Sequence, residues 1–91
     1  MSDVMVGGYT AYKTAITAEQ KALLAKAVGI GVNYSPIAVA TQVVAGINYR
    51  FLCNAQVTAP NTPVEGKLVQ FYVPLRSETP EQVKIQDIPC K

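Results

Sequence analysis

Apolar and polar residues alternate along the second half of the chain. From residue 47 to residue 57 the odd positions are apolar and the even positions are mostly polar. The same alternation returns at 67–73, and a shorter apolar stretch occupies 37–41. A period of two directs successive side chains to opposite faces of a strand, so these segments predict an antiparallel sheet with one buried face. The side chains predicted to face the core are Ile47, Tyr49, Phe51, Cys53, Ala55, Val57, Val69, Phe71 and Val73.

The stretches between these segments are rich in turn residues. Ala59–Pro63 holds two prolines and an asparagine, and 74–80 begins and ends with proline, so both are predicted loops. The segment 82–88 then forms the last strand, with Val83 and Ile85 facing inward. Residues 9–16 can add a short strand at the start.

One helix is predicted over 18–28, where the residues are Ala, Leu, Lys, Glu, Gln and a final Val. Thr17 is a suitable N-cap, Gln20 completes a capping box, and Gly29 can end the helix. The expected fold class is α+β, with a four- to five-stranded antiparallel sheet packed on one helix. A chain of 91 residues provides for one such domain, 1–91, in which 1–8 is a mobile N-terminal arm ending in two glycines.

The composition argues against an enzyme. Histidine is absent, which removes the commonest general base and the commonest metal ligand. Two cysteines alone cannot make a zinc site of the usual kind. We therefore expect no catalytic residue, no metal and no cofactor, and a function in recognition.

The charge and hydropathy exclude two further classes of partner. A net charge of +2, with scattered Lys and Arg, does not indicate nucleic-acid binding. No apolar run has the length of a membrane span. The first residues lack the basic start and apolar core of a secretory signal, so we expect a cytoplasmic protein, or a secreted one if a signal was removed.

The two cysteines are predicted to stay unpaired. In a meander the strand at 67–73 separates Cys53 from Cys90, which puts them beyond the reach of a disulfide, about 7 Å between Cα atoms. Cys53 is therefore expected to be a reduced core thiol, and Cys90 exposed and free.

The segment Gln42–Gly46 joins two predicted strands and must form the tip of a hairpin. Gly46 supplies the backbone freedom of a tight reversal. The valines at 43 and 44 are unusual at a turn, and apolar side chains held out in solvent indicate a contact surface. The alternative is that Val43 and Val44 finish the preceding strand and pack within the fold.

Gln42-Val43-Val44-Ala45-Gly46 resembles the Gln-x-Val-x-Gly signature of the cystatin family. Other segments of the chain also resemble the family, and they occur in the family's order along the sequence. Met5-Val6-Gly7-Gly8 is similar to the N-terminal trunk, and Asn48-Tyr49 to the residues that follow the signature. Val73-Pro74-Leu75 is similar to the Leu-Pro loop of the stefins, the single-domain members without signal peptide or disulfides. The trunk is closer to secreted and plant members, so the chain is stefin-like or phytocystatin-like.

The resemblance implies the cystatin fold and reversible, tight-binding inhibition of papain-like cysteine proteases, such as papain and the cathepsins. It implies a wedge of three pieces that fills the protease cleft, with Gly7 nearest the catalytic centre. The residues implied to bind the protease are Met5, Val6, Gly7, Gly8, Gln42, Val43, Val44, Ala45, Gly46, Pro74 and Leu75. The alternatives are a non-inhibitory cystatin-fold interaction module and a domain-swapped homodimer.

Magnitudes assign different roles to the pieces of the wedge. Burying Met5 and Val6 contributes roughly 3–6 kcal/mol. Ordering four or five residues of the arm costs roughly 4–10 kcal/mol. We therefore expect the two hairpin loops to supply the baseline affinity, and the arm to tune strength and protease choice.

Overall fold

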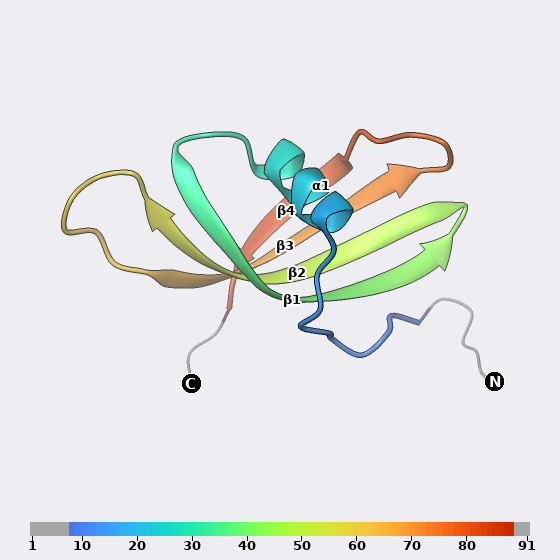
Figure 1. The fold of residues 1–91 in the computed structure, drawn as a ribbon, viewed down its shortest axis with the longest axis horizontal. Coiled ribbons are helices and arrows are strands. Elements are labelled where there is room, and N and C mark those ends of the chain that lie inside the picture. The colour runs from blue at the N-terminus through green and yellow to red at the C-terminus, as the bar shows by residue number, and fades with distance from the viewer. Residues whose placement is uncertain (1–7, 89–91) are drawn as a thin grey trace.

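The computed structural model describes residues 8–88 of the chain. Within them, consecutive strands pair antiparallel in the order β1-β2-β3-β4, and one helix lies across a face of the sheet (Figure 1). This arrangement is α+β, as predicted. Among residues 8–88, no helix is long and apolar enough to cross a membrane. The elements are α1 (Ala18–Val28), β1 (Val32–Val44), β2 (Gly46–Val57), β3 (Glu65–Pro74) and β4 (Glu81–Asp87).

Helix α1 has the boundaries that its capping residues predicted. The Thr17 hydroxyl accepts from the backbone N–H of Gln20 at 3.1 Å, and the Gln20 side chain accepts from the N–H of Thr17 at 3.0 Å. Gly29 ends the helix with a φ of 72°. Leu24 is the buried residue of the helix and points into the core.

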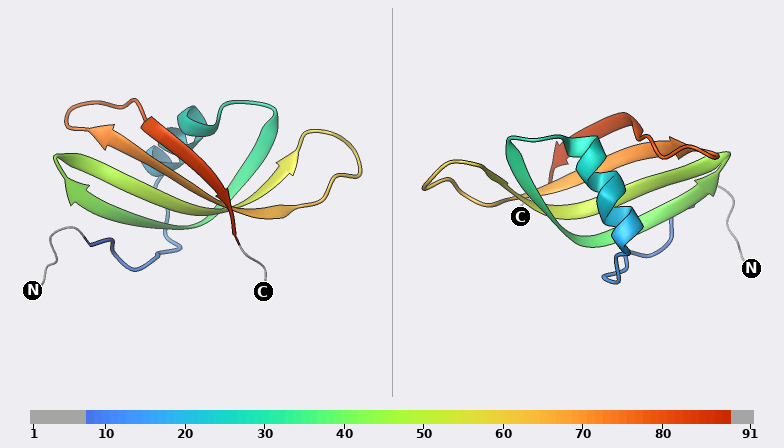
Figure 2. Two further views of the ribbon diagram at one scale, coloured as in Figure 1. Left: turned by 180° about the vertical axis from the view of Figure 1, so that it is seen from behind. Right: turned by 45° about the horizontal axis from the view of Figure 1, so that its top comes forward.

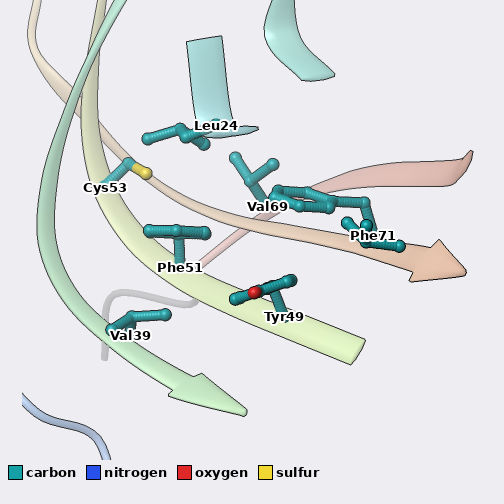
Figure 3. Packing of buried hydrophobic residues seen from close by; sticks show 8 residues of the cluster. Leu24, Val39, Tyr49, Phe51, Cys53, Val69 and Phe71 are labelled. Carbon is teal, nitrogen blue, oxygen red and sulfur yellow. The ribbon is translucent and has the colours of Figure 1, made fainter. Parts of the chain in front are cut away.

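The core lies between α1 and the concave face of the sheet (Figure 3). The rings of Tyr49 and Phe51 pack against Phe71, with centroids 5.4 and 5.8 Å from it. The predicted alternation of β2 and β3 is confirmed except at the far end of β2, where Val57 is exposed because it lies beyond the core. The core cluster is Leu24, Val39, Tyr49, Phe51, Cys53, Val69, Phe71 and Val73.

Cys53 is buried and free, as predicted. Burial raises the pKa of its thiol to about 11, which keeps the thiol protonated at neutral pH. The prediction for Cys90 lies outside the described residues.

Strand β1 is longer than the predicted 37–41. It begins at Val32 and continues through Pro36, where a β-bulge lies between Pro36 and Ala38. Proline is compatible with this strand because β1 is at the edge of the sheet and the bulge interrupts the ladder there.

The predicted inward orientation is confirmed for Ile85, but neither Val83 nor Ile85 is buried in the core. Ile85 pairs with Val69, which puts it on the core side of the sheet, yet both residues are exposed. Strand β4 is an edge strand with a neighbour on one side, and the core cluster is built from α1 and β1–β3.

The optional strand at 9–16 is reduced to an isolated bridge between Lys13 and Val39. Thr10 adds a further contact, because its N–H donates to the carbonyl of Thr41 at 2.8 Å. These bonds hold the chain along the outer edge of β1 before it reaches α1 (Figure 2).

Candidate functional site

The tip of the β1–β2 hairpin presents two valines to solvent. Val44 pairs with Gly46, so Ala45 alone lies between the two strands. Val43 is 76% exposed and Val44 is 43% exposed. The two valines do end strand β1, but their side chains are not packed within the fold. The predicted contact surface is therefore available at the hairpin tip.

The loop after β3 lies beside this tip. Gly46 pairs with Pro74 in the β2–β3 ladder, and both hairpin ends lie at one end of the sheet (Figure 1). Leu75, the next residue, is 70% exposed. We call the joint surface the apolar edge; it consists of Val43, Val44, Ala45, Pro74 and Leu75.

Gly46 is required by the closeness of β3 to the start of β2. Its φ is 119°, in the region that favours glycine. A Cβ atom at this position would lie 2.5 Å from the carbonyl oxygen of Val73 and 2.9 Å from the ring of Tyr72. The glycine of the Gln-x-Val-x-Gly pattern thus has a structural role: it lets β3 lie close to the start of β2, which brings the two parts of the apolar edge together.

A row of polar side chains supports the tip from the face opposite the core. Gln42, Asn48 and Tyr72 are in register across β1, β2 and β3. Asn48 Nδ2 donates to Gln42 Oε1 at 2.7 Å, and the Tyr72 hydroxyl donates to the carbonyl of Ala45. Gln42 is thus a supporting residue here, with its side chain half-buried.

The sequence does not signal the supporting role of Tyr72. Its side chain reaches Ala45 across 27 positions of the chain, and only the register of the strands brings them together.

The loop that carries Leu75 is tied to the helix. Lys26 Nζ donates to the carbonyl of Glu78 at 3.2 Å, and the N–H of Thr79 donates to Ser77 Oγ at 3.1 Å. A cleft of about 560 Å³ lies between α1, the start of β2 and this loop. Its lining includes Tyr49, whose hydroxyl pKa is raised by burial and then by the nearby Glu19.

The third predicted piece is described only at its end. Met5, Val6 and Gly7 lie outside the described residues, and the half-buried Gly8 is the first residue within them. The bond from Thr10 to Thr41 places this part of the chain beside the β1 segment that leads to the tip. Of the three predicted pieces, the structure thus brings together two, Gln42–Gly46 and Pro74–Leu75, through the pairing of Gly46 with Pro74.

Chemically, the apolar edge is suited to insertion into an apolar groove. None of its five side chains is charged or nucleophilic. Among residues 8–88, no group of three or more Cys, Asp or Glu side chains is placed to hold a metal ion. Comparison of the chain with protein-family models, with curated proteins and with solved structures finds no match.

Proposed function

We propose that the chain is a reversible, tight-binding inhibitor of papain-like cysteine proteases with a cystatin fold. The pairing of Gly46 with Pro74 carries the proposal, because it joins the Gln42–Gly46 tip and the Pro74–Leu75 loop into one exposed edge. The resemblance to the cystatins assigns these same two segments to the protease-binding wedge. The layer pair of one helix on an antiparallel sheet is compatible with that fold.

The apolar edge has suitable physical properties for a wedge. Burying Val43, Val44 and Leu75 contributes roughly 1.5–3 kcal/mol each. Both hairpin ends are already held by the β-ladder, so little conformational entropy is lost when they dock. An edge with no charged side chain also enters an apolar cleft without the cost of desolvating a charge.

The same ladder explains how the wedge can resist cleavage. A protease cleaves a peptide that lies extended across its catalytic centre. Val44 and Gly46 are instead paired with each other at a reversal, and Gly46 is also paired with Pro74. Opening this tip for cleavage requires breaking those pairs, so the docked edge blocks the cleft and dissociates intact.

Titration of papain activity with the purified monomer tests the proposal. Val44→Asp introduces a charge into the apolar edge, and we expect it to raise Ki roughly 10- to 100-fold. The matched control is Val64→Asp, since Val64 is also an exposed valine but lies before β3, at the opposite end of that strand from Pro74. We expect the control to change Ki less than twofold.

Each other outcome has a distinct meaning. Equal inhibition by wild type and Val44→Asp contradicts the assignment of the wedge. No inhibition of papain or of cathepsin-type enzymes favours the non-inhibitory interaction module. Size-exclusion chromatography before the assay separates any domain-swapped dimer, in which the same hairpin would be opened.

A further inference from the structure

The guanidinium group of Arg50 lies over the ring of Tyr9. The distance from Arg50 Cζ to the ring centroid is 3.9 Å, within the range of a cation–π contact. Arg50 Nε also donates to Gln70 Oε1 at 3.1 Å, and the two residues are paired across β2 and β3. Gln70 thus fixes the plane of the guanidinium on which the tyrosine ring rests. We call Tyr9, Arg50 and Gln70 the clamp.

The clamp lies on the face of the sheet opposite the helix. Tyr49 and Phe51 on either side of Arg50 are buried in the core, so Arg50 projects from the other face. The chain must therefore pass around the edge of β1 between Tyr9 and α1, as Figures 1 and 2 show. The bridge between Lys13 and Val39 attaches this part of the chain to the edge of β1.

The position of the clamp relates it to the apolar edge. Arg50 is in the strand that begins at Gly46, and Gln70 is in the strand that ends at Pro74. Each lies four positions along its strand from that end of the ladder, a distance of about 14 Å. Tyr9 directly follows Gly8, where the described part of the chain begins. All three clamp side chains are half-buried.

We infer that Arg50 is a positioning residue: it fixes on the sheet Tyr9, the residue that directly follows the N-terminal segment 1–8. This inference rests on the proposed function, in which that segment is the third piece of the wedge. A clamp that already holds Tyr9 reduces the freedom lost when the segment docks. Arg50 itself does not belong to the apolar edge.

The first test measures amide hydrogen exchange at Thr10, whose N–H donates to Thr41. We expect Arg50→Ala and Tyr9→Ala each to speed this exchange, and Arg50→Lys to have a smaller effect, because lysine lacks the planar guanidinium. The charge control is Lys21→Ala, an exposed cation on α1, which should leave the exchange unchanged. Unchanged exchange at Thr10 in Arg50→Ala overturns the clamp, whatever the protein inhibits.

The second test asks whether the clamp acts through the N-terminal segment. Arg50→Ala is measured in the full chain and in a full-length variant carrying Met5→Ser and Val6→Ser. In the first background we expect Ki for papain to rise two- to fivefold, the size of one exposed cation–π contact, and in the second to change less than 1.5-fold. An equal rise in both backgrounds means that Arg50 supports the fold alone and overturns the positioning role.

Failure of the clamp and failure of the proposed function are distinguishable. If the chain inhibits neither papain nor a cathepsin-type enzyme, the proposed function fails, while the exchange result at Thr10 still decides whether the clamp exists. If Val44→Asp weakens inhibition and Arg50→Ala does not, the proposed function stands and the positioning role is overturned.

Discussion

At the residue scale, Gly46 connects the sequence motif to the geometry of the hairpins. Any side chain here meets the backbone of Val73 in a conformation that L-residues rarely adopt. We expect Gly46→Ala to lower the free energy of unfolding by about 1–3 kcal/mol, measured by urea denaturation. Gly66→Ala is the control, since its new Cβ would meet Ile88 at an ordinary 3.5 Å. A change of more than about 1 kcal/mol in the control, or none in Gly46→Ala, contradicts the explanation.

Cys53 gives a prediction about pH. Its pKa is raised from 9.0 to about 11 in the folded protein, so the folded state keeps a proton that the unfolded state releases above pH 9. Its contribution to stability is therefore complete below pH 9 and is lost as the pH rises to 11, by about 2 kcal/mol. Urea denaturation across this range should show a steeper loss for wild type than for Cys53→Ala. Parallel pH profiles of the two proteins would contradict the raised pKa of the Cys53 thiol.

At the scale of the element, the helix is defined by local signals. Thr17→Ala removes one half of the capping box, and we expect the free energy of unfolding to fall by about 1 kcal/mol. Urea denaturation followed by circular dichroism measures the change. The exposed Thr14, which precedes the helix, provides the control Thr14→Ala, with an expected change below about 0.5 kcal/mol. Equal effects of the two substitutions would argue against the cap.

The elements differ in how far the sequence predicts them. Helix α1 is predicted in full because its start and end depend on neighbours in the chain, Thr17 with Gln20 and then Gly29. Strand β1 is predicted too short because Pro36 breaks a regular ladder, and only the sheet order reveals an edge with a bulge. The sequence predicts the inward orientation of Ile85 but not its exposure, since the alternation does not reveal that β4 is an edge strand.

At the scale of the whole molecule, the sequence predicts the tip better than its surroundings. The exposure of Val43 and Val44 at a hairpin tip is predicted from a motif of contiguous residues and from their position between two strands. The contacts of Tyr72 with Ala45 and of Arg50 with Tyr9 depend on the strand register and on the path around β1. Such contacts join residues far apart in the chain, so no periodicity or spacing indicates them.

A structure of the complex with papain tests the central claim most directly, using enzyme carboxymethylated at its active-site cysteine. We predict that Val43, Val44 and Leu75 are buried in the protease cleft and that the chain is uncleaved. The loop at Ala59–Pro63, at the other end of the sheet, should remain in solvent. A complex that leaves the apolar edge exposed, or the absence of any complex at micromolar concentrations, would contradict the claim.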